Sequence, residues 1–343
     1  MPRLICIAAG ETGWDPGSAD YVVGTSAGSV IGALLACGVP PWLMVAHQAG
    51  ESLDGLSDSR GEAADRVDRS GGSRYRLERK GFALGPGSWR LAAASLAHPT
   101  RYSPMSVLSG WLPEGLVSTE PLKDTVRRVC RDPWAPHPNY WAVAVDYDDG
   151  HRVAFGRDGA PIATLPDAVA ASCAIPGFYR AVRIDGRRYV DGGVRSASNL
   201  DILRDESLDL VIALNPMSSL ESIAPRALAD RLAVGARAMI GRRLGSEARR
   251  LRGAGTEVVL IQPTAADLTV MGPNPMNGRR RQAVMSTATR TMAEQLRASE
   301  LGDRIRALPA GQSVLVRRPE DPPSSWPDFY EAAKSRWVTE PVA

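Results

Sequence analysis

A serine between two glycines is the residue of this chain best placed to do chemistry. Residues 24–28 read Gly-Thr-Ser-Ala-Gly, a G-x-S-x-G sequence, with the apolar run 21–23 before it and the small apolar run 29–36 after it. This order predicts a strand, a sharp turn and a helix, and such a turn exposes the hydroxyl of its serine, Ser26. The pattern favours Ser26 as the nucleophile of an acyl transfer. The alternative is a glycine-rich turn in which Ser26 only caps the helix.

The expected helix start could also stabilise the product of a nucleophilic attack. The first amides of a helix have no partner within it and attract a developing negative charge. We expect the amide of Ala27, the residue after the nucleophile, to act as one oxyanion donor. Gly24 and Gly28 are expected to keep the bend free of side chains that would clash.

Histidine is not the expected base for this serine. In the chain order of the α/β-hydrolases, the acid and then the histidine follow the serine, near the C-terminus. No histidine lies beyond position 151, which excludes a Ser–His–Asp triad in that order. The four histidines are expected to be loop or surface residues: His47, His98, His137 and His151.

A carboxylate can take the serine proton directly if it lies against the hydroxyl in a dry site. Two aspartates that precede a glycine are candidates, Asp158 and Asp191. Asp-Gly is a common hairpin turn, which suits Asp158. Asp191 comes directly after the second arm of a hairpin predicted around the Asp-Gly at 185, so another tight turn there would be redundant. Gly192 and Gly193 instead favour a backbone that passes close to another element.

With Ser26 and Asp191 together, the chain resembles the patatin-like phospholipase family, whose pattern is a G-x-S-x-G elbow followed by a D-G-G or D-G-A turn. Residues 170–179, Ala-Ala-Ser-Cys-Ala-Ile-Pro-Gly-Phe-Tyr, are similar to the family's A-A-S-x-A-x-P segment. The agreement covers residues 20–200. The resemblance implies a Ser26–Asp191 dyad, with Asp191 preferred over Asp158, and a lipid or fatty acyl ester as substrate. It implies no cofactor and no metal.

The N-terminus departs from this pattern. The family opens with a strand and a glycine-rich loop whose amides form most of the oxyanion hole, whereas Gly10 and Gly13 are isolated here. Either the chain is truncated, so that residues 4–9 are the end of the helix after that loop, or the protein lacks the loop and is catalytically weakened. We favour truncation. Loss of one oxyanion donor typically costs about 10²–10³ in rate.

Composition limits the partners and the compartment. The formal net charge of the 343 residues is +3, and aromatic residues are not interleaved with the basic ones, so nucleic acid is not expected as a partner. The four cysteines are scattered, and no run approaches twenty apolar residues, which favours a cytoplasmic protein without a metal site or a membrane span. Arginines in the predicted helices after residue 220 form either a solvated face or a peripheral contact with anionic lipid. They are Arg226, Arg231, Arg237, Arg242, Arg243, Arg249, Arg250, Arg252 and Arg279–Arg281.

Alternating apolar strands and amphipathic helices predict one α/β domain, a mixed and largely parallel sheet with helices on both faces. We expect this domain at 1–310, with the motifs at 20–200, a lid-like or variable insertion at 54–113 that includes a surface excursion at 55–72, and a loosely packed, Pro-rich tail at 311–343. The expected strands are 21–23, 139–147, 151–155, 209–216 and 257–261. The expected helices include 26–38, 118–130, 165–173, 223–251 with a break near Gly241 or Gly245, and 281–301.

The sequence as a whole predicts a soluble serine lipid acyl hydrolase of the phospholipase or carboxylesterase type, working through an acyl-enzyme. The alternative is a catalytically impaired patatin-like protein that acts as a lipid-binding or scaffolding module, because the oxyanion loop is missing.

Overall fold

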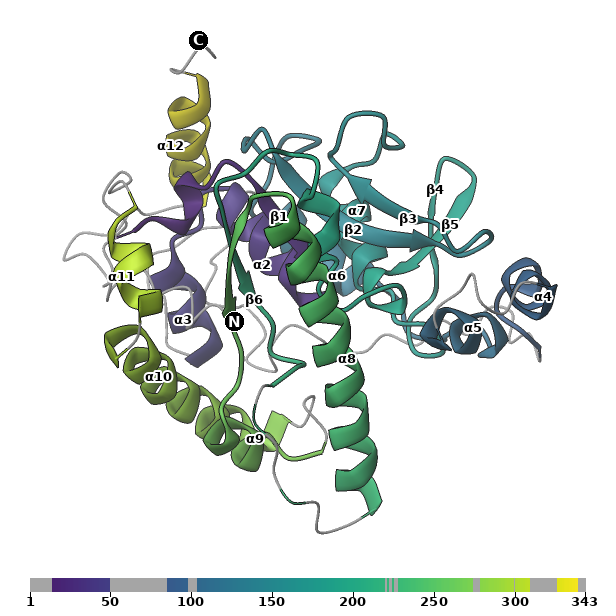
Figure 1. Cartoon of the computed structure of the whole chain (residues 1–343). Coiled ribbons are helices and arrows are strands. Elements are labelled where there is room, and N and C mark those ends of the chain that lie inside the picture. The colour runs from purple at the N-terminus through teal and green to yellow at the C-terminus, as the bar shows by residue number, and fades with distance from the viewer. Residues whose placement is uncertain are drawn as a thin grey trace. The chain divides into compact units, whose positions relative to one another are not determined.

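A computed structural model describes residues 14–49, 85–97, 104–219, 221, 224, 228–273, 278–298, 300–308 and 326–338. The chain divides into two compact units (Figure 1). Residues 17–195 and 317–343 form the unit that contains the G-x-S-x-G sequence, called the elbow unit below. Residues 1–16 and 196–316 form the other, called the long-helix unit. The predicted excursion at 55–72 and the isolated Gly10 and Gly13 lie outside the described residues.

The elbow unit is built on one mixed sheet of five strands. β2 (Tyr140–Asp146) pairs with β1 (Val22–Thr25) in parallel and with β3 (Arg152–Phe155) and β5 (Arg187–Asp191) antiparallel, and β4 (Val182–Ile184) pairs antiparallel with β5. All seven residues of β2 are buried, as expected of a strand that is covered on both faces.

Helices cover both faces of this sheet. Tyr140, Ala142 and Ala144 of β2 belong to the main core, which they share with α2 (Ala27–Ala36), α3 (Pro41–Ala49), α6 (Glu120–Arg127) and α7 (Leu165–Ser172). Val145 and Tyr147 join a second cluster that includes Leu91 of α4 (Trp89–Ala97), the helix that packs on α5 (Pro104–Trp111). Alternate residues of a strand point to opposite faces, so β2 alone accounts for both clusters.

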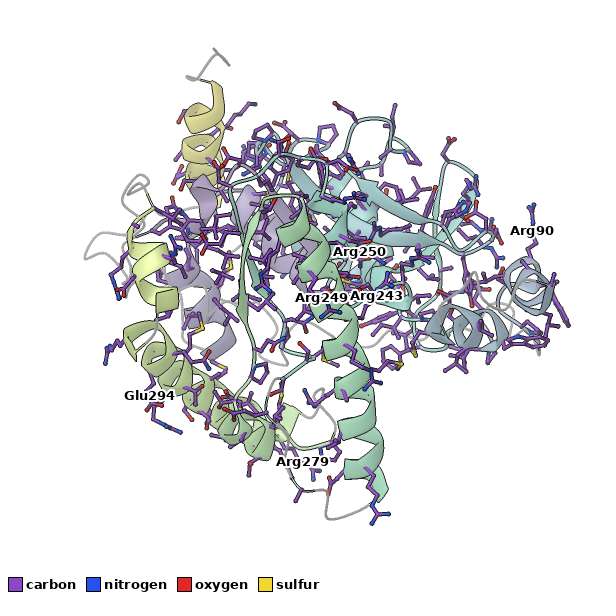
Figure 2. The ribbon with its side chains drawn as sticks, in the orientation of Figure 1. Arg90, Arg243, Arg249, Arg250, Arg279 and Glu294 are labelled. Carbon is purple, nitrogen blue, oxygen red and sulfur yellow. The ribbon has the colours of Figure 1, made fainter. Side chains whose placement is uncertain are left out.

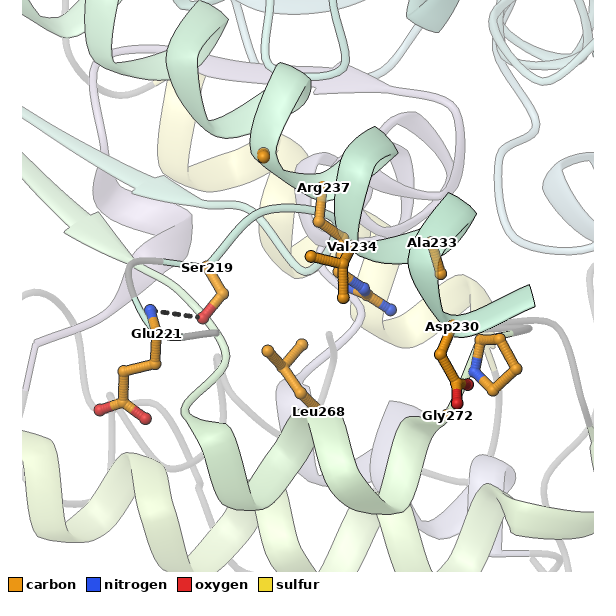
Figure 3. A pocket seen from close by; sticks show the side chains of 10 residues that line it. Ser219, Glu221, Asp230, Ala233, Val234, Arg237, Leu268 and Gly272 are labelled. Carbon is orange, nitrogen blue, oxygen red and sulfur yellow. Dashed lines mark hydrogen bonds between the residues drawn. The ribbon is translucent and has the colours of Figure 1, made fainter. Parts of the chain in front are cut away.

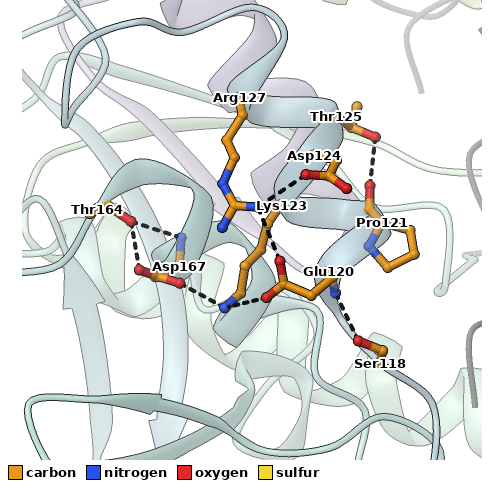
Figure 4. A network of polar contacts seen from close by, with 9 residues as sticks. All are labelled: Ser118, Glu120, Pro121, Lys123, Asp124, Thr125, Arg127, Thr164 and Asp167. Atoms are coloured by element: carbon orange, nitrogen blue, oxygen red, sulfur yellow. Dashed lines mark hydrogen bonds and ion pairs between the residues drawn. The ribbon is translucent and has the colours of Figure 1, made fainter. Parts of the chain in front are cut away.

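Polar contacts fasten α6 to α7 (Figure 4). Nζ of Lys123 in α6 lies 2.8 Å from Oδ1 of Asp167 in α7 and 3.1 Å from Oε1 of Glu120. The hydroxyl of Thr164 accepts a hydrogen bond from the amide of Asp167 and thereby caps α7. These partly exposed ion pairs contribute little stability each, about 0–1 kcal/mol, whereas α7 packs in the main core through Leu165, Ala168 and Val169.

The C-terminal segment contains α12 (Trp326–Val338), which packs on the core of the elbow unit. Tyr330 is buried, and its hydroxyl donates to Asp132 Oδ2 at 2.8 Å, which Lys334 also contacts at 3.2 Å. The expectation of a loosely packed tail is therefore wrong for residues 326–338. The apolar pair Tyr330 and Ala333, three residues apart on one helical face, decides the packing despite the prolines that surround the helix.

In the long-helix unit, β6 (Leu210–Leu214) and β7 (Glu257–Ile261) form a parallel pair. α8 (Leu228–Gly253) is one continuous helix, so the break expected near Gly241 or Gly245 is wrong; a single glycine costs a helix only about 1 kcal/mol. α9 (Ala265–Met271), α10 (Arg281–Ala298) and α11 (Glu300–Arg306) follow. The predicted helix 281–301 corresponds to α10 and the first residues of α11.

The α/β class, the mixed sheet and the helices on both faces are confirmed. The parallel share is smaller than expected: among the described strands, β1–β2 and β6–β7 are parallel, whereas β2–β3, β2–β5 and β4–β5 are antiparallel. Among the described residues, no helix combines the length and apolar character that crossing a bilayer requires.

Candidate active site

The strand pairing brings the two predicted catalytic residues together. β1 and β3 both pair with Ala142 and Val143 of β2, so they must lie on opposite edges of β2. β3 and β5 both pair with Ala144 and Val145, so β5 also lies on the edge opposite β3. β1 and β5 therefore share one edge of β2 and run toward each other along it. β1 ends at Thr25, opposite Val143, and β5 ends at Asp191, opposite Ala144. Ser26 and Asp191 meet because their strands end at adjacent positions of the same edge.

Ser26 has the backbone conformation of a nucleophile elbow. Its φ is 54° and its ψ is −126°, at the junction between β1 and α2. A non-glycine residue at positive φ is strained by roughly 1–3 kcal/mol and persists only where its surroundings hold it. The amide of Ser29 donates to the Ser26 carbonyl at 2.8 Å, and the Ser29 hydroxyl donates to the same carbonyl at 2.7 Å.

Ser172, at the end of α7, holds the other side of the elbow. Its hydroxyl oxygen accepts a hydrogen bond from the Ser26 amide at 3.0 Å and donates one to the Val143 carbonyl of β2 at 2.6 Å. The sequence predicts no role for Ser172 beyond its place in the Ala-Ala-Ser segment. Its contact with Ser26 spans 146 residues, and no spacing in the sequence indicates such a contact.

The two glycines of the motif play different steric parts. A Cβ on Gly24 would lie 2.4 Å from the carbonyl oxygen of Gly28 and from the Cα of Ser29, so Gly24 keeps the bend open as expected. A Cβ on Gly28 would meet nothing within 4 Å, so the steric role expected of Gly28 is wrong.

This difference gives a matched pair of substitutions. Gly24→Ala is expected to lower the free energy of unfolding by at least about 2 kcal/mol, because backbone atoms must move. Gly28→Ala is expected to leave it within about 1 kcal/mol, or to raise it slightly, since alanine is favoured in a helix. Urea unfolding of both variants measures the difference, and equal effects would contradict the elbow geometry.

Asp191 lies in a nearly dry environment beside Ser26. Its carboxylate accepts a hydrogen bond of 2.7 Å from the amide of Gly193. Burial raises the pKa of Asp191 to about 6, although interactions with the Ser26 side chain and the Gly193 amide act to lower it. A Cβ on Gly192 would lie 2.4 Å from the Val143 carbonyl oxygen, so the backbone at Gly192 passes close to β2, as expected for this glycine.

The raised pKa of Asp191 makes this carboxylate costly to the fold. A carboxyl whose pKa is higher in the folded than in the unfolded protein destabilises the fold once both states are ionised, here by about 3 kcal/mol above about pH 6. Asp191→Asn is therefore expected to raise the free energy of unfolding by about 1–3 kcal/mol at pH 7–8. The gain should shrink as the pH falls from about 6 to about 4, where the aspartate is neutral in both states. Urea unfolding at several pH values measures it, and a gain that does not depend on pH would refute burial as its cause.

The start of α2 supplies a hydrogen-bond donor beside Ser26. Ala27 is the first residue of α2 and is exposed, so its amide has no carbonyl one turn earlier within the helix. It lies where the first oxyanion donor was expected. Residues 4–9, which were predicted to end the helix after the glycine-rich loop, lie outside the described part of the chain.

The other candidates for a base lie away from Ser26 or have structural roles. Asp158 is exposed in the turn after β3. His137 is buried, and its ring contacts the Ala19 carbonyl and the Asn139 amide. His151 is exposed beside Asp149. The side chain of His47 and the whole of His98 lie outside the described residues.

A cysteine next to the elbow is kept neutral. Cys173 Sγ lies 3.7 Å from the Ser29 hydroxyl, and burial, with the nearby charge of Asp191, raises the pKa of its thiol to about 12. The three cysteines of the described part, Cys37, Cys130 and Cys173, are free and buried. No cluster of three histidine, cysteine or carboxylate side chains suited to a metal occurs there either.

A cavity of about 210 Å³ lies in the long-helix unit, between α8 and α9 (Figure 3). Its lining includes Arg237, Leu268 and Ser219, whose hydroxyl donates to the Pro263 carbonyl at 2.6 Å and is not paired with a base. Neither Ser26 nor Asp191 lines this cavity. This cavity is therefore separate from the candidate active site at Ser26 and Asp191.

Comparison with protein families agrees with the geometry. A family model described as "Patatin-like phospholipase" matches residues 18–204, more than half of the chain. The matched region begins before β1 and ends after the turn at residues 191–194, so it includes both Ser26 and Asp191. On this match, the chain belongs to the patatin-like phospholipase family.

Proposed function

We propose that this chain is a serine lipid acyl hydrolase that uses Ser26 as nucleophile and Asp191 as base. The family supports a hydrolase of the phospholipase type that acts on lipids. The observation that carries the finer assignment is that β1 and β5 end at adjacent positions on one edge of β2, which brings Ser26 to the buried carboxylate of Asp191. A buried, basic carboxylate against a serine at a helix N-terminus is the minimum that acyl transfer requires.

The reaction proceeds through an acyl-enzyme. Asp191 accepts the Ser26 proton as the serine oxygen attacks the ester carbonyl, and the amide of Ala27 donates to the resulting oxyanion. The protonated Asp191 then gives its proton to the departing alcohol, which leaves the acyl group on Ser26. Asp191 then takes a proton from a water molecule as the water oxygen attacks the acyl-enzyme. The protonated Asp191 gives this proton to the departing Ser26 oxygen, which releases the carboxylic acid and restores both residues.

The pKa of Asp191 suits this role. An aspartate with an ordinary pKa near 4 is a weak base for a hydroxyl, whereas a value of about 6 leaves Asp191 largely ionised at neutral pH and more able to hold a proton in the transition state. The same burial that destabilises the fold therefore raises the basicity that the reaction needs.

A second candidate function is a lipid-binding or scaffolding protein with little turnover. The small number of oxyanion donors favours it, because within the described residues the elbow itself supplies one donor, the amide of Ala27. The two functions predict different results with an activated ester.

We propose that the protein is cytoplasmic and that the arginine-rich α8 can contact a membrane surface peripherally. Three of its arginines are engaged internally: Arg243 Nε contacts the buried Glu247 at 2.8 Å, Arg252 donates to the Val258 carbonyl and Arg237 donates to the Pro216 carbonyl. Arg249 and Arg250 are exposed toward the end of α8 (Figure 2), as is Arg242. Anionic lipid and plain solvent both suit this face.

Stopped-flow hydrolysis of p-nitrophenyl butyrate by the purified full chain separates the two functions. An acyl hydrolase is expected to release about one equivalent of p-nitrophenol per chain in a fast phase and then turn over. Fatty acid release from phospholipid vesicles then identifies the lipid substrate. A folded chain without either phase would favour the scaffolding function.

A further inference from the structure

α4 and α5 present large apolar side chains to solvent. Trp89 and Leu96 of α4 are 68% and 70% exposed, and Met105, Leu108 and Trp111 of α5 are between 43% and 50% exposed. The three residues of α5 are spaced three apart, so they form one stripe along the helix. These five side chains are called the apolar face below. They make up nearly half of the large hydrophobic residues that are exposed in the described part of the chain.

The apolar face is not the core side of these helices. Leu91 and Ala92 of α4 are buried, as are Ser106, Ser109 and Gly110 of α5, and a Cβ on Gly110 would lie 3.2 Å from the Ala92 amide nitrogen. The two helices thus pack on each other through small residues and through Leu91. Their outward apolar side chains remain after this packing is complete, which is unusual for a soluble surface and marks a contact site.

The helix that carries most of the apolar face contacts the turn that follows Asp191. The Ser106 hydroxyl of α5 donates to the Val194 carbonyl at 3.2 Å, three residues after Asp191, and the Tyr147 hydroxyl donates to the Ser109 carbonyl at 2.8 Å. Ile175 and Phe178, each 36% exposed, are two further apolar side chains on the surface of the elbow unit. Ile175 directly follows Ala174, whose carbonyl accepts the Asp191 amide at 3.0 Å.

The charge of these helices suits a lipid headgroup layer. Neither α4 nor α5 contains an acidic residue, and the one charged residue of the pair, Arg90, is exposed and points outward (Figure 2). Tryptophan concentrates at the membrane–water interface, and leucine and methionine enter the acyl region below it. A cation beside them meets phosphate or an anionic lipid.

We propose that the apolar face of α4 and α5 docks on the surface of a phospholipid bilayer and so brings the elbow unit to its substrate. This inference rests on the proposed function, because it gives a lipid hydrolase access to an insoluble substrate. The contact is a shallow interfacial one, made by side chains that enter the headgroup boundary. It lies on the elbow unit and is distinct from the arginine-rich face of α8.

Sedimentation with vesicles tests this contact without turnover. The Ser26→Ala chain is mixed with vesicles of phosphatidylcholine containing phosphatidylglycerol, at low salt and at about 1 M salt, where the Debye length falls to about 3 Å. Trp89→Gln, Leu96→Gln and Leu108→Gln are combined in one variant. The matched control is Ile162→Ser, which removes an apolar side chain that is 95% exposed outside the face.

The triple variant is expected to bind vesicles at least about tenfold more weakly, because three apolar side chains no longer enter the bilayer. The Ile162→Ser control should bind as the parent does, and binding by the parent should persist at high salt. Brominated lipid should quench tryptophan fluorescence in the parent and less in Trp89→Gln. Because all substituted side chains are exposed, circular dichroism is expected to show unchanged folding.

Equal binding by the triple variant and the parent would overturn the proposal, and so would a parent that does not bind vesicles. Binding that disappears at high salt and depends on Arg242 and Arg249 would assign the contact to α8 instead. A face that joins two copies would appear as a dimer that the triple variant converts to a monomer, with vesicle binding unchanged. Hydrolysis of soluble p-nitrophenyl butyrate by the wild-type chain is read separately, so loss of docking and loss of the proposed function are distinguishable.

Discussion

Ser26→Ala is expected to reduce acyl-ester turnover by at least about 10³-fold, because the nucleophile is removed and no neighbouring hydroxyl can replace it. Ser29 lies close by, but its hydroxyl is committed to the Ser26 carbonyl at 2.7 Å. The fold should survive, since alanine is smaller than serine and only the interaction of the hydroxyl with Asp191 is lost. The free energy of unfolding should change by no more than about 1 kcal/mol.

Initial rates with p-nitrophenyl butyrate measure this effect, and urea unfolding checks the fold. Ser286→Ala is the matched control, because Ser286 is an exposed serine on α10 whose hydroxyl contacts only its own helix. It should hydrolyse the ester at the wild-type rate. Unchanged turnover in Ser26→Ala would place the nucleophile elsewhere in the chain.

Asp191→Asn is expected to reduce turnover by about 10²–10⁴-fold, the range that general base catalysis contributes. The asparagine keeps the shape of the side chain and can still accept the Gly193 amide, but it does not take the serine proton. Asp158→Asn is the matched control, since Asp158 is also followed by glycine but is exposed in the turn after β3. Asp158→Asn should retain wild-type activity, and the reverse pattern would reassign the base.

The pH dependence of the wild-type enzyme separates a base from a merely structural aspartate. The free enzyme needs Asp191 ionised, so kcat/KM should be constant above about pH 7 and fall about tenfold per pH unit below about 6. The residual activity of Asp191→Asn should lack this limb. Activity that falls only below about pH 4 would mean that the acting carboxylate has an ordinary pKa.

Sequence patterns anticipate the elbow well because the constraint is local. A strand, a tight turn and a helix follow from residues 21–36 alone, and the steric need for Gly24 follows from the turn itself. The hairpin around residue 185 was also predictable, because an Asp-Gly pair there separates two short arms with apolar residues, and the structure has it as β4 and β5.

The long-range features needed the structure. That β1 and β5 approach each other along one edge of β2 depends on three strand pairings, and no spacing in the sequence encodes them. The support that Ser172 gives to the Ser26 amide likewise arises from the placement of α7. In α12, the buried Tyr330 outweighs a Pro-rich composition, and in α8 neither Gly241 nor Gly245 interrupts a helix of 26 residues.

Labelling with a fluorophosphonate tests the central claim most directly, because the probe reacts only with an activated serine. The wild-type chain is predicted to carry one adduct, located on Ser26 by mass spectrometry of its peptides, with a labelling rate that falls below about pH 6. Asp191→Asn should label far more slowly, whereas Asp158→Asn should label normally. A folded chain in which Ser26 stays unmodified, or in which Asp191→Asn labels as fast as wild type, would contradict the dyad.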